Sequence, residues 1–217
     1  MDLNNKTVAF LGDSITEGLG ASAPSNHYVN VFSKIANAKV LNYGIGGTRF
    51  APQSNPSVCE IWDKDFISRV PEMEKDVDAV VVFGGTNDFG HGDAPFGDVS
   101  DTEATTFCGA CDYLMRLLIE KYPTKPIIFM TPLHRLTEEY LTSEIGIERK
   151  PLSEYVSVIK KKAEKYSIPV LDLFGASGMQ PNIDAQNKSY FVDGLHPNDE
   201  GHRKIAEKLK NFMTANI

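Results

Sequence analysis

Two short segments, far apart in the chain, carry the residue types of a serine nucleophile and its base. Ser14 follows a run of apolar residues, within Gly12-Asp13-Ser14-Ile15. His196 stands three residues after Asp193, in a segment that ends with Pro197. A serine hydroxyl becomes nucleophilic when a base removes its proton. A carboxylate that holds one imidazole nitrogen leaves the other free to act as that base.

Two further segments carry groups that stabilise a negatively charged oxygen. Gly46 and Gly47 allow backbone N–H groups to approach a substrate, and Asn87 offers an uncharged side-chain donor. Each of these features also has a structural explanation. A helix N-cap explains Ser14, and ordinary turns explain the Asp193–His196 segment, the glycine pair and Asn87. The functional interpretation depends on all four segments meeting at one place.

The elements that must position these residues alternate along the chain. Five short apolar runs are typical of strands buried on both faces of a parallel sheet. Stretches with helical spacing lie between them. This alternation predicts one three-layer α/β/α domain over residues 1–217. The predicted strands are Thr7–Leu11, Lys39–Tyr43, Asp78–Phe83, Pro126–Met130 and Pro169–Leu173, and the helical stretches are His27–Ala36, Asp65–Met73, Glu103–Lys121, Leu152–Tyr166 and Glu200–Met213.

The chemically interesting segments all follow predicted strands. In parallel sheets of this kind, ligands bind outside the carboxyl ends of the strands. Ser14 follows the first run, the glycine pair the second, Asn87 the third, and the Asp193–His196 segment comes after the fifth. We therefore expect all of them at one edge of one sheet.

With these motifs in this order, the sequence resembles the GDSL/SGNH hydrolases. The matching segments are Gly12-Asp13-Ser14-Ile15, Asn42-Tyr43-Gly44-Ile45-Gly46-Gly47, Gly85-Thr86-Asn87-Asp88 and Asp193-Gly194-Leu195-His196-Pro197. They spread over nearly the whole chain. The first motif departs from the family name, because Ile15 stands where the family has leucine. The chain lacks the G-x-S-x-G segment of the common α/β-hydrolases.

The resemblance implies a flavodoxin-like sheet of five parallel strands in the order 2-1-3-4-5. It also implies roles for individual residues. Ser14 is the expected nucleophile, His196 the base and acid, and Asp193 the residue that orients His196. The expected oxyanion hole consists of the backbone N–H groups of Ser14 and Gly47 and the side chain of Asn87. The resemblance implies neither a metal nor an organic cofactor.

The expected activity is hydrolysis of carboxylic esters with a short acyl group, as in a carbohydrate acetylesterase. The alternative is a thioesterase or lysophospholipase that acts on longer acyl chains, since the same residues would serve. A non-catalytic module that binds a small ligand is the remaining alternative. It leaves Asp193 and His196 unexplained, and the chain lacks both common phosphate-binding glycine motifs.

Composition narrows the range of partners. The net charge is −7, from 22 basic and 29 acidic residues, which disfavours binding to nucleic acid or to an anionic membrane surface. No apolar stretch approaches the roughly 20 residues of a membrane span. The first residues lack the pattern of a signal peptide, so a cytoplasmic location is the expectation. The partner is therefore expected to be a small-molecule ester.

The loops decide substrate choice, and the sequence offers only candidates there. The segments 89–105 and 135–151 could form rims or lids over the site. Asp13 is expected to support the Ser14 loop, and is grouped with Phe89, His91 and His134 as a candidate substrate-binding residue. The C-x-x-C segment Cys108–Cys111 lies in a helical pattern, which favours packing over redox or metal chemistry. Other large residues near these loops are Arg49, Phe50, Trp62 and Arg135.

Overall fold

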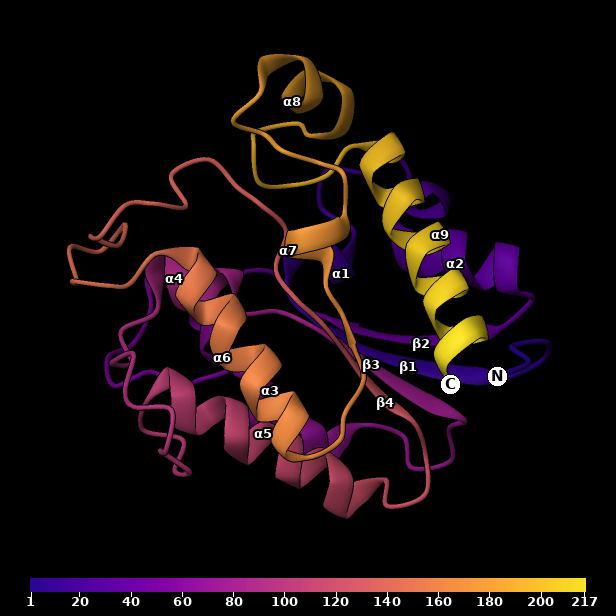
Figure 1. The fold of residues 1–217 in the computed structure, drawn as a ribbon, viewed down its shortest axis with the longest axis horizontal. Coiled ribbons are helices and arrows are strands. Elements are labelled where there is room, and N and C mark those ends of the chain that lie inside the picture. Colours follow the sequence, from indigo (N-terminus) through magenta and orange to yellow (C-terminus); the bar gives the residue numbers. More distant parts are fainter.

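Five parallel strands form one sheet in the order β2-β1-β3-β4-β5. Figure 1 labels the first four strands of the chain, β1 to β4. The structure is a computed structural model that describes residues 1–217. Its fold confirms the predicted α/β class and the expected strand order. The strands are β1 (Thr7–Gly12), β2 (Lys39–Gly44), β3 (Ala79–Phe83), β4 (Ile127–Met130) and β5 (Val170–Leu171).

Helices cover both faces of this sheet. In Figure 1, α2 and α9 pack side by side over one face, and α3, α5 and α6 lie over the other. No helix is both long enough and apolar enough to span a membrane. The helices are α1 (Ser14–Glu17), α2 (Tyr28–Ala36), α3 (Phe66–Arg69), α4 (Thr86–His91), α5 (Phe107–Lys121), α6 (Leu152–Lys165), α7 (Leu173–Ala176), α8 (Asp184–Tyr190) and α9 (Asp199–Asn216).

Strand β1 shows why the apolar runs are continuous. Successive side chains of a strand point to opposite faces, and here both faces are covered. Val8 and Phe10 pack in the core beneath α2 and α9, whereas Ala9 and Leu11 pack in the core on the other side. All four are completely buried. Strand β3 is buried along its whole length in the same way.

Three predicted elements have different limits in the structure, each for a local reason. Strand β5 has only two residues, because Asp172 caps α7 by accepting a hydrogen bond from the Gly175 N–H. Helix α3 gives way to a 3₁₀ turn that contains Pro71, whose missing N–H cannot continue an α-helix. Helix α5 begins only at Phe107, because Thr106 is its N-cap.

Besides the short helix α7, two polar helices lie where the sequence pattern predicts only loops. Helix α4 begins directly after Gly85 and includes the first three residues of the segment 89–105. Helix α8 interrupts the long connection between β5 and the Asp193–His196 segment, and in Figure 1 it stands apart from the sheet. Both are short and rich in polar residues, so their apolar spacing is too weak to indicate a helix.

Two glycines bring the ends of β1 and β2 against α1. Gly12 and Gly44 are paired residues at the carboxyl ends of these neighbouring strands. A Cβ atom on Gly44 would lie 2.2 Å from the Glu17 backbone nitrogen. Only glycine permits this approach, which sets the turn after β2 directly beside the helix that begins with Ser14.

His202 joins three elements around this region through a neutral ring. It lies in α9 and is fully buried. Its Nδ1 accepts a hydrogen bond from the Tyr28 N–H at 3.2 Å, and its Nε2 lies 3.1 Å from the Leu19 carbonyl oxygen. Because Nδ1 accepts, the single ring proton is on Nε2 and is donated to Leu19. Burial lowers the pKa of His202 to about 4.

Acid should therefore weaken the fold through His202. Its pKa is about 4 in the folded protein and 6.5 ordinarily. The unfolded chain thus takes up the extra proton first as the pH falls, and stability is lost between these two values. His202→Gln offers a similar donor and acceptor without titrating. Between pH 7 and pH 5, wild type should lose about 1–2 kcal/mol more unfolding free energy than the variant. Urea unfolding at both pH values tests this, and equal losses would contradict it.

Candidate active site

Ser14 is the first residue of α1, immediately after the end of β1. The Asp13 carboxylate caps this helix by accepting a hydrogen bond from the Ile15 N–H at 3.0 Å. Asp13 is almost completely buried, and its burial raises its pKa to about 7. Backbone N–H groups in the first turn of a helix have no carbonyl partner within the helix. The Ser14 N–H is therefore available beside its own hydroxyl.

A hydrogen-bonded chain links Ser14 to His196 and Asp193. The Ser14 Oγ lies 3.0 Å from His196 Nε2, and His196 Nδ1 lies 2.7 Å from an Asp193 carboxylate oxygen. The carboxylate can only accept, so Nδ1 carries the proton and donates it to Asp193. His196 Nε2 is then unprotonated and accepts from the serine hydroxyl. This is the arrangement that a serine nucleophile and its base require.

The turn that carries Asp193 and His196 is held from both sides. Burial alone would raise the pKa of Asp193. The carboxylate accepts hydrogen bonds from the His196 ring and from the backbone N–H groups of His196 and Leu195. These bonds have a larger effect than burial, so the pKa of Asp193 lies below its usual value. The Gly194 carbonyl accepts a hydrogen bond from the Leu136 N–H at 2.9 Å. Gly194 has a φ of +81°, and a Cβ atom there would strike the Leu136 side chain. The loop after β4 thereby positions the turn.

One backbone N–H in the turn after β2 remains free. The Gly46 N–H donates to the Glu17 carboxylate at 2.8 Å, and the Thr48 N–H donates to the Ile45 carbonyl. Between them, the Gly47 N–H makes no hydrogen bond within the chain. Gly47 has a φ of +74°, a conformation that glycine adopts readily. Glu17 thus leaves Gly47, and not Gly46, as the available donor.

Asn87 reaches the same turn from α4. One N–H of its side chain donates to the Thr48 carbonyl at 3.0 Å, which leaves the second without a partner in the chain. The next residue, Asp88, accepts hydrogen bonds from the backbone N–H groups of Phe50 and Ala51. Burial raises the pKa of Asp88 to about 6 despite these bonds. The side chains of Asn87 and Asp88 thus bind α4 to the segment that follows β2 through hydrogen bonds.

Arg69 supports this corner, and the sequence pattern does not single it out. Its guanidinium is buried and donates to the carbonyl oxygens of Gly12 and Tyr43 and to the Thr48 hydroxyl. Burial lowers the pKa of Arg69 to about 10, so it remains charged at neutral pH. One side chain therefore ties together the ends of β1 and β2 and the turn around Gly47. The only hint in the sequence is a charged residue in a mainly apolar helical stretch.

The other candidate substrate-binding residues have different surroundings. Phe89 is fully buried with its ring beneath Arg149, and Asp13 is the helix cap, so neither offers surface to a substrate. The His134 ring is hydrogen-bonded to the Glu138 carboxylate, and the ring centroids of His134 and Phe174 lie 3.8 Å apart. His91, by contrast, lines a cavity near the site.

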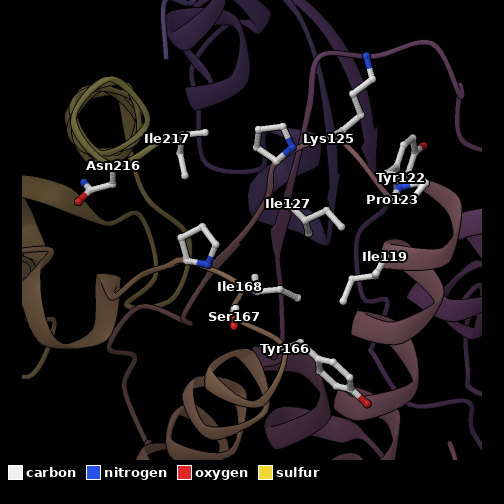
Figure 2. Close-up of a pocket in the computed structure, with 12 residues that line it drawn as sticks. Ile119, Tyr122, Pro123, Lys125, Ile127, Tyr166, Ser167, Ile168, Asn216 and Ile217 are labelled. Atoms are coloured by element: carbon white, nitrogen blue, oxygen red, sulfur yellow. The ribbon is translucent and has the colours of Figure 1, made fainter.

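A second concavity lies far from this site. Its volume is about 630 Å³, and it is lined at the amino ends of β4 and β5 by residues such as Ile127, Ser167 and Ile168 (Figure 2). Ser14 lies at the opposite, carboxyl edge of the sheet. No His, Cys, Asp and Glu side chains are grouped to hold a metal ion. Cys108 and Cys111 belong to α5 and are buried in the core between this helix and the sheet.

One known family matches most of the chain. The model of the GDSL-like Lipase/Acylhydrolase family matches residues 10–204. The chain belongs to this family. As a GDSL-like acylhydrolase it is a carboxylic ester hydrolase. No curated protein matches the chain.

Solved structures share the fold of this GDSL-like protein over nearly their full length. A Lactobacillus plantarum protein is 32% identical with a TM-score of 0.83, and the match covers 99% of each chain. A possible lipase from Chitinophaga pinensis is 21% identical with a TM-score of 0.70, over 97% of this chain and 98% of that one. A carbohydrate acetylesterase family member from Sinorhizobium meliloti is 18% identical with a TM-score of 0.63, over 98% and 100%.

Glu17 should act as a positioning residue for the turn that contains Gly47. Glu17→Ala removes the acceptor of the Gly46 N–H, so the turn should lose order. We expect kcat for nitrophenyl acetate to fall about five- to tenfold, equivalent to about 1 kcal/mol. Glu17→Gln keeps an acceptor oxygen and should retain most of the activity. Full activity in Glu17→Ala, or equal loss in both variants, would contradict this role.

Proposed function

We propose that the protein hydrolyses esters of short acyl groups through a covalent acyl-enzyme on Ser14. Two consecutive hydrogen bonds carry this proposal. Ser14 Oγ lies 3.0 Å from His196 Nε2, and His196 Nδ1 lies 2.7 Å from the Asp193 carboxylate. The free N–H of Gly47 and the unpaired amide N–H of Asn87 lie on the neighbouring turn and helix. Together they supply a nucleophile, a base and donors for an oxyanion.

The proposed reaction has two steps, acylation of Ser14 and hydrolysis of the acyl-enzyme. Ser14 Oγ attacks the ester carbonyl carbon while its proton passes to His196 Nε2. The carbonyl oxygen becomes negative and accepts hydrogen bonds from the N–H groups of Ser14, Gly47 and Asn87. The C–O bond to the alcohol then breaks, and His196 protonates the leaving oxygen. Water next gives a proton to His196 and attacks the acyl carbon, which frees the carboxylic acid and returns the proton to Ser14.

Polar side chains in a cavity beside the site support a short acyl group. The cavity lined by Trp62, which contacts Gly47, has a volume of about 290 Å³, and the polar side chains of Arg49, His91 and Asp93 are part of its lining. A long aliphatic chain would leave those polar groups without partners. Two neighbours named as an acetyl xylan esterase and a carbohydrate acetylesterase share the fold, at 19% and 18% identity. A carbohydrate acetylesterase is accordingly our preferred form of the proposal.

Exposed apolar side chains favour the alternative, an esterase or thioesterase for longer acyl chains. Leu136 contacts Gly194 and is 37% exposed, and Val192, next to Asp193, is 57% exposed. Ile145, at the rim of the cavity, is 54% exposed. Such side chains on the loops around the site could accept part of an acyl chain that extends beyond the cavity.

Nitrophenyl esters from acetate to octanoate separate these possibilities. Wild type should cleave the acetate with the highest kcat/KM, because a longer aliphatic chain would leave polar side chains of the cavity without partners. Ser14→Ala should lose activity by several orders of magnitude. A kcat/KM that rises with chain length would favour the alternative. Equal activity in wild type and Ser14→Ala, or no activity on any ester, would contradict the proposal and revive a non-catalytic binding module.

Asn87→Ala tests the oxyanion hole separately from the nucleophile. It removes a donor whose partner forms only during the reaction, so kcat should fall about 100- to 1000-fold, or about 3 kcal/mol, with little change in KM. Asn87→Asp keeps the size of the side chain but places a negative charge there, and should be at least as inactive. Thermal melting of each variant checks the fold. More than a tenth of wild-type kcat in a folded Asn87→Ala protein would exclude this role.

A further inference from the structure

A cavity of about 290 Å³ begins where the turn around Gly47 meets the indole ring of Trp62. Three segments line it: the loop after β2, the end of α4 with the residues that follow, and the loop after β4. The lining residues that matter for the argument are Arg49, Gln53, Asn55, Trp62, His91 and Asp93. The reaction steps described above assign no role to the side chains that line the cavity.

Trp62 and His91 connect the cavity to the proposed oxyanion hole. A Cβ atom on Gly47 would lie 2.2 Å from Trp62 Cδ1 and 2.3 Å from Nε1, so the N–H edge of the indole lies against this glycine. His91 follows Asn87 by four residues in α4, which puts the two side chains on one face of the helix. The rings of Trp62 and His91 lie 4.8 Å apart between centroids. A substrate bound at Ser14 can therefore extend past both rings.

Both rings present an N–H group without a partner in the chain. Arg49 Nη1 lies 3.0 Å from His91 Nδ1. Because the guanidinium only donates, Nδ1 accepts, and the His91 proton is on Nε2. Burial and the neighbouring Arg49 lower the pKa of His91 to about 4, so the ring stays neutral. Neither His91 Nε2 nor Trp62 Nε1 makes a hydrogen bond within the chain. Neither atom is among the buried polar atoms that lack a partner, so both can be reached by a ligand.

The surrounding wall is preorganised. The Asp93 carboxylate accepts hydrogen bonds from the backbone N–H groups of Ser54 and Asn55 and from the Asn55 side chain. In return, the Asp93 N–H donates to the Gln53 side chain. These bonds fix the loop after β2 against the end of α4. A site whose walls are already ordered binds its ligand at a smaller entropic cost.

The charges around the cavity favour a neutral ligand. Arg49 is its only cation, and it is paired with Asp63 at 2.8 Å. Asp93 adds a second carboxylate, so the three ionised groups sum to −1. A phosphate or carboxylate would meet this excess negative charge. The two free donors are uncharged and suit the oxygen of a hydroxyl group, and the flat rings suit the C–H face of a sugar.

We propose that this cavity binds an uncharged, hydroxyl-bearing part of the ester, with the N–H groups of Trp62 and His91 donating to its oxygens. A sugar in the alcohol half and a hydroxylated acyl group share this chemistry. The proposal rests on the proposed function, because it takes the ester to be bound at Ser14. Trp62 and His91 are then specificity-determining residues outside the catalytic triad.

Two matched substrate pairs test the proposal in kinetic assays. An acetylated methyl glucoside is compared with ethyl acetate, and ethyl 3-hydroxybutyrate with ethyl butyrate. Wild type should prefer the hydroxylated member of one pair, and that pair identifies the half of the ester that occupies the cavity. Trp62→Phe and His91→Phe keep a ring but lose the donor. Each should reduce the preference, measured as a ratio of kcat/KM values, about tenfold.

Two further variants separate recognition from structure. His91→Gln keeps an acceptor for Arg49 and an N–H donor, so it should retain most of the preference. Tyr140→Phe removes an exposed hydroxyl outside the cavity and should leave the ratio unchanged. Ratios within twofold of wild type in both phenylalanine variants at positions 62 and 91 would overturn the proposal. So would the absence of any preference in wild type, or a higher kcat/KM for acetyl-coenzyme A than for the glucoside.

Direct binding distinguishes failure of this proposal from failure of the proposed function. If wild type hydrolyses no ester, the proposed function fails, and methyl glucoside and 3-hydroxybutyramide are titrated into the protein by calorimetry. Binding of either compound that weakens about tenfold in Trp62→Phe supports the cavity assignment. Absence of binding for both, or binding that Trp62→Phe does not weaken, overturns it.

Discussion

The parallel pairing of β1 with β2, which ends at Gly12 opposite Gly44, is the constraint on which the site depends. It brings the start of α1 and the turn after β2 together without a side chain between them. The positions of Ser14 and of the free Gly47 N–H follow from this contact. Arg69 stabilises it by bonding both strand ends and the Thr48 hydroxyl. A buried cation at this place makes the corner rigid before any substrate arrives.

Much of the architecture was predictable, because burial on both faces produces continuous apolar runs that the sequence displays directly. Since parallel strands end at one edge, the sequence also indicated which distant segments would meet there. The limits of elements were less predictable, because single residues such as Pro71 and Asp172 decide them. Helices α4 and α8 were missed because short polar helices are stabilised by tertiary contacts that leave no periodic signal.

The surroundings of the site were the least predictable part. Phe89 follows a functional motif closely, yet the helical turn of α4 directs it into the core. The contact of Trp62 with Gly47 depends on the path of an irregular loop that has no repeating pattern. Glu17 and Arg69 act through hydrogen bonds to backbone atoms, and any sequence supplies such acceptors and donors. Composition and spacing therefore indicate candidate reacting groups more readily than the residues that position them.

The separation of Ser14 from His196, 182 residues along the chain, has a consequence for how activity arises. Synthesis proceeds from the amino terminus, so the ribosome produces Ser14, the proposed nucleophile, long before His196, its proposed base. In the proposed mechanism, the Ser14 hydroxyl has no proton acceptor until the turn that carries His196 docks. A polypeptide without this turn would then not hydrolyse esters, and the onset of hydrolysis would report that the native topology is complete.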